Sequence, residues 1–364
     1  RRSPAPRGGS SADPTTGKHR PLTNERSLAS HLPAITATLN GLLETTSNEV
    51  LAEVIRATET FNLEVSPEVF LDHFTNRKNP SSIRLAVLKT LEKIKPAPLE
   101  KTLITSLEDP RAEIRTNSFA ALARLAPDSA LTAAQSILAS GSPGDQQNVY
   151  QVLAKTDHPG ARTLILKRLR KLAAQPTAVH LDILEAARAQ KTPDLQKALA
   201  AYQAQLDPAD PLSQYAVALE GGDIAKGRAV FYNHGAAQCT RCHKGQKNRL
   251  KGGVAGPHLK DVGLLHERAY LLESLFKPNA KIAPGYGTVA VTLKDGTVIG
   301  GTLNKETEKE ILVTDLASGE QKRFPRSQIT TMTRPMSTMP AMAGILTKAE
   351  ARDLVAYLAS LKSQ

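Results

Sequence analysis

Apolar residues recur with helical spacing between about Leu28 and Leu212, in segments that Pro, Asn, Asp and Gly separate. Several of these segments repeat at an offset of 31 residues. The residues that align at this offset are Ile83 with Ile114, Leu88 with Phe119 and Tyr150, and Leu91 with Leu122, Leu153 and Leu184. A helix pair of this size cannot bury its apolar face alone, so we expect repeated pairs to stack into an α-solenoid.

One of these segments resembles a HEAT repeat. It reads Leu107-Glu108-Asp109-Pro110, followed by Ile114-Arg115 and Ala120-Ala121-Leu122. The resemblance implies a scaffold or docking surface. We therefore expect residues 27–213 to form a HEAT-like helical repeat domain, with a non-repetitive helical domain and chance matches as the alternative.

The ends and the composition limit the remaining possibilities. Residues 1–26 are rich in Arg, Ser, Pro and Gly without apolar periodicity, which predicts a flexible tail or linker. Since the chain begins Arg1-Arg2, we expect a processed or excised piece. No apolar run approaches the ~18 residues that cross a bilayer, so no transmembrane segment is predicted. The 4% aromatic content, without tryptophan, favours a mainly α protein over a β-sandwich.

The chain is strongly basic. Its 47 Lys and Arg against 35 Asp and Glu give a formal net charge of +12. A basic surface suits nucleic acid, anionic lipid or an acidic protein partner. Because there is no helix-turn-helix, RNP or zinc-finger signature, we expect no nucleic acid partner.

Residues 214–364 form a second expected domain. Asp223 is a predicted N-cap for a helix over 223–231, and Thr347 with Glu350 predicts a capping box for a terminal helix. Between these helices the apolar period changes to two, which predicts a small β insert at about 287–330 that supplies no ligand. Two hairpins are expected, the first from Thr288–Leu293 and Thr297–Thr302 around Lys294-Asp295-Gly296, the second from Ile311–Thr314 and Gln321–Phe324.

The only two cysteines stand as Cys239-Thr240-Arg241-Cys242-His243. At this spacing both thiols can add to the vinyl groups of one haem, and His243 is presented to the iron from one side. Two cysteines placed at random would show this spacing before a His with a probability on the order of 10⁻⁴. We therefore predict one covalent haem c, with His243 as an iron ligand.

Two other chemistries could use the same cysteines. A zinc site would use His258 and His266, but their spacing from the cysteines lies outside that of zinc fingers and no second cysteine pair exists. A thioredoxin-like dithiol needs a βαβ context, whereas a helix is predicted before this motif. Both remain as the weaker alternatives.

Residues 221–364 resemble a class I cytochrome c. Gly227 and Phe231 stand where that family packs its first helix against its last, and a small residue such as Gly227 permits a close crossing. The matching face of the last helix would be Leu354, Tyr357 and Leu358. The resemblance implies attachment of the haem on the periplasmic or equivalent face of a membrane, so an extracytoplasmic location is expected.

The resemblance also implies two further haem contacts. Gly256-Pro257-His258-Leu259 resembles the loop whose proline carbonyl accepts a hydrogen bond from the haem histidine, although an ordinary turn would read the same. The sixth ligand would come from Ser337-Thr338-Met339-Pro340, before the terminal helix. A thioether ligand favours ferrous iron and raises the reduction potential of a haem. Met339 is our choice, with its three neighbours Met332, Met336 and Met342 as open alternatives.

The combined pattern resembles the haem-binding domain of planctomycete and verrucomicrobial proteins. Its further mark here is the stretch Pro278-Asn279-Ala280-Lys281-Ile282-Ala283-Pro284-Gly285-Tyr286. In that group the domain commonly ends a polypeptide with a sugar-dehydrogenase-like region, which this chain lacks. The resemblance thus implies an electron-transfer protein of a dehydrogenase system rather than a stand-alone enzyme.

We expect one-electron transfer from a dehydrogenase to a respiratory acceptor. One alternative is a haem peroxidase or small-ligand-binding protein with a labile sixth site. Another is a HEAT-type scaffold with an accessory haem domain. Basic residues around the motif would be either a solvated face or a docking patch for an acidic redox partner; they are Arg241, Lys244, Lys247, Arg249 and Lys251.

Overall fold

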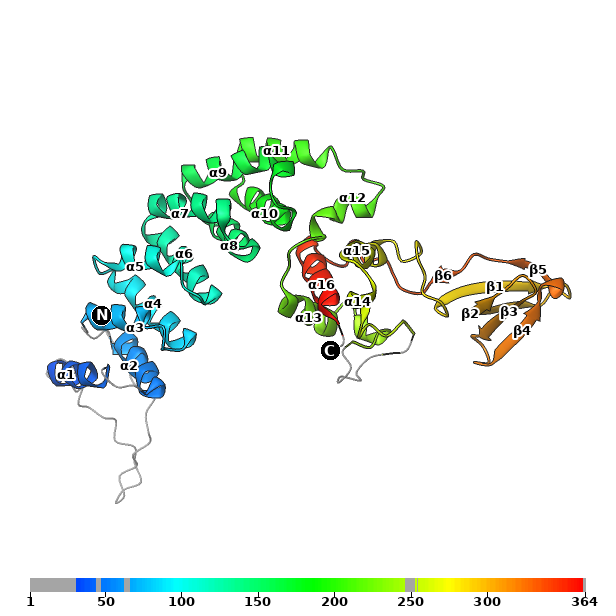
Figure 1. Ribbon diagram of the computed structural model, residues 1–364, viewed down its shortest axis with the longest axis horizontal. Helices are drawn as coiled ribbons and strands as arrows, with labels where there is room; N and C mark the ends of the chain where they lie inside the picture. The colour runs from blue at the N-terminus through cyan, green and yellow to red at the C-terminus, as the bar shows by residue number, and fades with distance from the viewer. Residues whose placement is uncertain (1–30, 44–46, 62–65, 246–252, 254, 363–364) are drawn as a thin grey trace, which may run out of the picture. The chain divides into compact units, whose positions relative to one another are not determined.

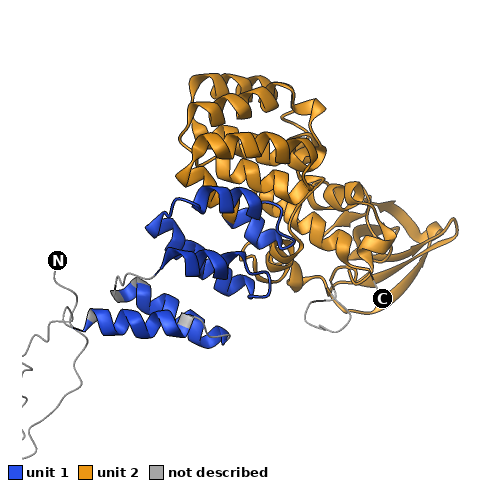
Figure 2. Cartoon of the chain, turned by 60° about the vertical axis from the view of Figure 1, so that its left-hand side comes forward, with its two compact units in different colours: residues 1–117 blue, residues 118–364 orange. Residues whose placement is uncertain are grey.

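The chain is mainly helical and carries one small antiparallel sheet (Figure 1). The computed structural model describes residues 31–43, 47–61, 66–245, 253 and 255–362. The chain divides into two compact units, Arg1–Asn117 and Ser118–Gln364 (Figure 2). The tail expected at 1–26 lies outside the described residues, and the boundary expected at 213 lies within the second unit.

Short helices build the first unit, and a sixth crosses its boundary. They are α1 (Leu32–Leu43), α2 (Asn48–Phe61), α3 (Pro67–Thr75), α4 (Ser81–Ile94), α5 (Leu99–Ser106) and α6 (Ala112–Leu125). Phe70 and Phe74 of α3 are fully buried against α4. Arg84 of α4 is also buried, and its guanidinium lies 2.6 Å from the Asp109 carboxylate. Burial disfavours the ionised carboxylate, yet this Arg84 contact and the Arg111 N–H hold the pKa of Asp109 below its usual value.

The second unit begins with further short helices, most of which start at a proline. They are α7 (Pro127–Ser140), α8 (Pro143–Leu153), α9 (Pro159–Arg170), α10 (His180–Gln190), α11 (Pro193–Gln203) and α12 (Pro211–Tyr215). Proline is favoured at the first helical position because its missing N–H would have no partner there. Among the described residues no helix is long and apolar enough to span a bilayer.

The 31-residue offset corresponds to alternate helices. Each residue aligned at this offset is buried, and these residues lie on α4, α6, α8 and α10. The sequence therefore identified the buried face of every second helix in the series.

The remaining helices are α13 (Ile224–Asn233), α14 (Val262–Leu265), α15 (Arg268–Phe276) and α16 (Lys348–Ser360). The predicted caps are confirmed: the Asp223 carboxylate accepts from two backbone N–H groups at the start of α13, and Thr347 and Glu350 form a capping box on α16. The predicted close crossing is confirmed too. A Cβ at Gly227 would lie 1.8 Å from the Asp353 carbonyl oxygen, so only glycine allows α13 to approach α16 this closely.

A buried ion pair joins the helical series to the terminal helix. The Arg352 guanidinium of α16 lies 2.6 Å from the Asp182 carboxylate of α10. The Asp182 side chain is fully buried and that of Arg352 is 7% exposed. This buried contact therefore joins α10 to α16 across the boundary expected at 213.

The sheet has the order β4-β3-β2-β1-β5, with the short β6 paired to β1. Its strands are β1 (Gly287–Leu293), β2 (Val298–Glu306), β3 (Glu310–Asp315), β4 (Gln321–Pro325), β5 (Ile329–Met332) and β6 (Met336–Ser337). Both predicted hairpins are confirmed, because β1 pairs with β2 and β3 with β4 in antiparallel register. The sheet has its own small core of Val289, Val291, Ile311, Val313 and Phe324.

Candidate functional site

The Cys-Thr-Arg-Cys-His motif folds into one tight turn after α13. Gln238 adopts a left-handed backbone with φ of +43°, and a 3₁₀ turn follows at Cys239–Arg241. The Cys239 carbonyl accepts from the Cys242 N–H at 3.2 Å and from the His243 N–H at 2.9 Å. Both thiols are free and half-buried, and burial raises the pKa of Cys239. The turn thus presents two thiols and one imidazole to the same side.

The imidazole of His243 is held in one tautomer. Its Nδ1 lies 2.9 Å from the carbonyl oxygen of Pro257, the contact that the cytochrome resemblance implied. Because a carbonyl only accepts, Nδ1 must donate, which leaves the lone pair on Nε2. Burial lowers the pKa of His243, although the Pro257 contact opposes this shift. The neutral imidazole therefore offers Nε2 as a metal ligand.

The loop that carries Pro257 lies directly on the motif. A Cβ at Gly256 would come within 2.5 Å of Cε1 of His243, and one at Gly253 within 1.8 Å of the Arg241 carbonyl oxygen. The Gly256 N–H also donates to the Cys242 carbonyl at 2.9 Å. Glycine is required at both positions, because a side chain would overlap the His243 ring at Gly256 and the motif backbone at Gly253.

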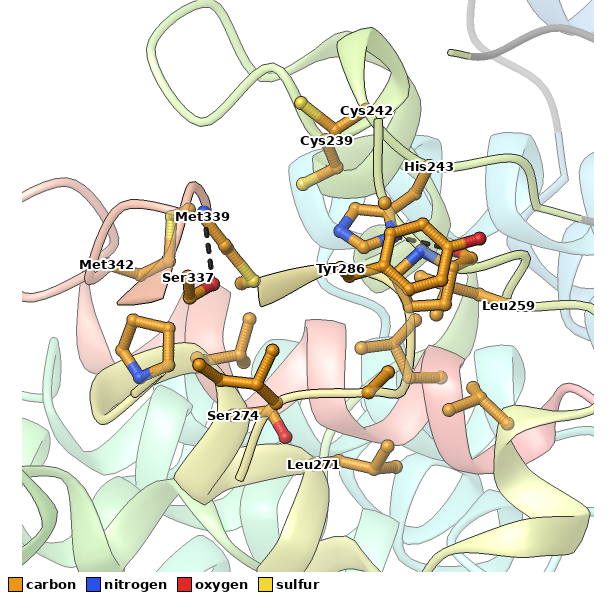
Figure 3. A pocket seen from close by; sticks show the side chains of 18 of the residues that line it. Cys239, Cys242, His243, Leu259, Leu271, Ser274, Tyr286, Ser337, Met339 and Met342 are labelled. Atoms are coloured by element: carbon orange, nitrogen blue, oxygen red, sulfur yellow. Dashed lines mark hydrogen bonds between the residues drawn. The ribbon is translucent and has the colours of Figure 1, made fainter. Parts of the chain in front are cut away.

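The motif opens onto a cavity of about 360 Å³ (Figure 3). This volume lies within the range of ligand and cofactor sites, ~300–1,000 Å³. Most of the wall is apolar, and it includes Phe231 from α13, Leu271 from α15, and Leu354 and Leu358 from α16. These helices belong to the same buried core, so the cavity lies along one side of that core.

The methionines divide into two pairs. Met339 and Met342 line the cavity, whereas Met336 is 58% exposed and Met332 packs against the core of the sheet. Met342 is 3% exposed and belongs to the helical core. Met339 is half-buried, and Figure 3 shows its side chain and the His243 ring on opposite sides of the pocket.

The two histidines of the zinc alternative lie at the same cavity. His258 and His266 both line the cavity. Nδ1 of His258 accepts from the Lys260 N–H at 3.1 Å, and the His266 ring stacks on Tyr270 with centroids 3.8 Å apart. In the part of the chain that the structure describes, no three His, Cys, Asp or Glu side chains are grouped to hold a metal ion.

The structure describes only two of the five basic residues around the motif. Arg241 is exposed and Lys244 is half-buried. Lys247, Arg249 and Lys251 lie outside the described residues. The choice between a solvated face and a docking patch therefore stays a prediction.

One wall of the cavity comes from a stretch that marks the haem-binding resemblance but for which the sequence predicted no position in the site. The loop between α15 and β1 contributes Pro278, Ile282, Ala283 and Tyr286 to the lining. Its two prolines and Gly285 predict a loop. No periodicity in this loop shows that it lines the same cavity as the cysteines, because that arrangement depends on contacts distant in sequence.

No protein-family model matches the chain, and no curated protein matches it. The chemistry of the site therefore depends on its own residues.

Proposed function

We propose that this chain carries one covalent c-type haem and transfers single electrons through it. The observation that supports this function is one apolar cavity lined by both cysteines, a thioether and an imidazole whose Nδ1 is hydrogen-bonded to Pro257. Cys239 and Cys242 would form the thioether bonds, and His243 Nε2 and the Met339 sulfur would ligate the iron. A bound haem would supply the one-electron chemistry.

The protein's own residues would prepare this site. Pro257 fixes the orientation of the His243 ring and increases its basicity. The apolar wall excludes water and lowers the local dielectric constant, which would raise the reduction potential of the haem. A thioether from Met339 favours ferrous iron and acts in the same direction.

The fold supports a class I cytochrome c domain at 214–364. Support comes from the close crossing of α13 and α16 at Gly227, and from Phe231 and Tyr357, whose ring centroids are 5.7 Å apart. Residues 27–213 would be a HEAT-like solenoid, which the buried 31-residue pattern supports. This region would present a docking surface for a larger assembly.

Location and partner follow from the cofactor. Attachment of haem c occurs on the periplasmic or equivalent side of a membrane, so the protein would act outside the cytoplasm. The electron donor would be a dehydrogenase. The net charge of +12, with Arg241 exposed beside the motif, favours an acidic partner.

The test is expression with the haem-maturation machinery, followed by haem staining of a denaturing gel. The wild type should keep its stain, and Cys242→Ala should lose most of it. In the reduced and oxidised spectra, Met339→Ala should abolish the near-infrared band of a Met-ligated ferric haem. Met336→Ala is the matched control, because Met336 is exposed and does not line the cavity. An unstained wild type that contains zinc would refute the proposal.

A labile sixth site is the second candidate, because Met339 is only half-buried. Cyanide and carbon monoxide distinguish the two functions. Binding to the wild type as tight as to Met339→Ala would indicate a site for small ligands or peroxidase chemistry. Much weaker binding to the wild type supports electron transfer.

A further inference from the structure

The sheet joins the helical core through two segments that both border the cavity. β1 begins at Gly287, one residue after Tyr286, and β6 ends at Ser337, two residues before Met339. The two strands pair with Gly287 opposite Ser337. A Cβ at Gly287 would lie 2.8 Å from the side chain of Pro335, so the two segments are in close contact. The position of β6 therefore determines where the Met339 segment begins.

A short chain of hydrogen bonds continues from β6 to Met339. Oδ1 of Asn279 accepts from the Ser337 N–H at 2.7 Å. The Ser337 hydroxyl oxygen in turn accepts from the Met339 N–H at 3.1 Å (Figure 3). Asn279 lies 58 residues before Ser337 and outside both strands, so this contact adds a second attachment to that of the sheet.

The other side of the Met339 segment is fixed as well. The Met342 N–H donates to the Leu275 carbonyl of α15 at 2.9 Å, and the Met342 side chain is 3% exposed. Asn279 lies three residues after the end of α15 at Phe276. The residues from Ser337 to Met342 are therefore held at both ends by one helix and the loop that follows it.

We propose that Asn279 is a positioning residue that holds the Met339 thioether towards the iron. This inference rests on the proposed function. Asn279 acts through Ser337, since its hydrogen bond is to backbone rather than to sulfur. Because Asn279 is exposed, removing its side chain breaks this hydrogen bond and leaves no buried cavity. The sixth ligand should then leave the iron more readily.

Imidazole binding to the ferric protein measures this effect, because imidazole competes with Met339 for the iron. Asn279→Ala should bind imidazole about 2- to 10-fold more tightly, the factor that corresponds to one ordinary hydrogen bond. It should also have a weaker near-infrared band and a lower potential. Asn279→Asp keeps an acceptor oxygen and should restore the wild-type values. Ser337→Ala removes the next hydrogen bond, so it should shift binding the same way and add little to Asn279→Ala.

Asn304→Ala is the matched control. Oδ1 of Asn304 also accepts a hydrogen bond, from the Thr314 hydroxyl at 2.8 Å, but on the sheet away from Met339. A wild type with the band, in which Asn279→Ala and Ser337→Ala bind imidazole no more tightly than Asn304→Ala, would overturn this inference alone. A wild type without covalent haem would overturn the proposed function and this inference together.

Discussion

The helical core and the sheet core of the second unit differ in whether their side chains leave a cavity. The helical core draws residues from Ala218 to Leu361 and leaves a cavity along one side. The sheet core consists of side chains between Val289 and Phe324. The strands that carry them pair with one another through backbone hydrogen bonds. A core built from neighbouring strands can close by itself, whereas one built from distant helices has room for a bound group. The two cores should therefore respond separately to substitution.

The largest effect is expected at the buried ion pair between α10 and α16. Asp182→Ala should lower the free energy of unfolding by about 3–5 kcal/mol, because it leaves Arg352 buried without its partner. Urea denaturation followed by circular dichroism measures the loss. The double variant Asp182→Leu with Arg352→Met is the control, and it should cost much less because neither charge remains. A loss below about 1 kcal/mol for Asp182→Ala would indicate that α10 and α16 are independent.

A substitution in the sheet core tests the separation directly. Ile311→Ala should destabilise the sheet by about 2–5 kcal/mol, since Ile311 is fully buried. Urea should then unfold the sheet first. In protein that carries the proposed haem, the covalent attachment and the His243 ligation should survive this first transition. The near-infrared band should disappear, because β6 no longer holds the Met339 segment. A single transition that removes every spectral feature at once would mean that the two cores unfold together.

The crossing of α13 and α16 should give an intermediate effect. Gly227→Ala should cost about 1–3 kcal/mol, because the added methyl group overlaps the backbone of Asp353. Thermal denaturation measures this change. Gly235→Ala is the matched control, since a Cβ there meets nothing within 4 Å. Equal melting temperatures for the two variants would contradict the close crossing.

The smallest effect is expected at the start of α16. Thr347→Ala should cost about 1 kcal/mol at neutral pH, because the helix loses its capping box. The hydrogen bonds from Thr347 hold the pKa of Glu350 below its ordinary value of 4.5. A carboxyl group whose pKa is lower in the folded than in the unfolded protein stabilises the fold at a pH above its unfolded-state pKa. This stabilisation is lost as the pH falls through the folded-state pKa. The difference between Thr347→Ala and wild type should therefore shrink below pH 4.5, and a pH-independent difference would contradict this.

Local sequence patterns predicted much of this structure. Asp223 and Thr347 identified helix starts, Lys294-Asp295-Gly296 identified a hairpin, and the 31-residue offset identified buried faces. Each of these signals depends on residues within a few positions of one another or on a simple period. The helical content and the sheet could therefore be expected before any coordinates.

Contacts between distant segments could not be predicted in this way. Arg352 and Asp182 are 170 residues apart, and Ser337 and Asn279 are 58 residues apart. Asparagine and aspartate are common in loops and helices for local reasons, so their residue types indicate no distant partner. For the same reason the sequence named Met339 but not the residues that hold its segment.

The position of the motif within its cavity has a consequence for the order of events during synthesis. Most residues of the wall follow Cys239 in the chain, and the last of them, Leu354 and Leu358, lie on the final helix. A chain that emerges from its N-terminus presents both thiols before the wall that encloses them exists. Covalent attachment of the proposed haem would therefore precede enclosure, and α16 would then close over the attached group.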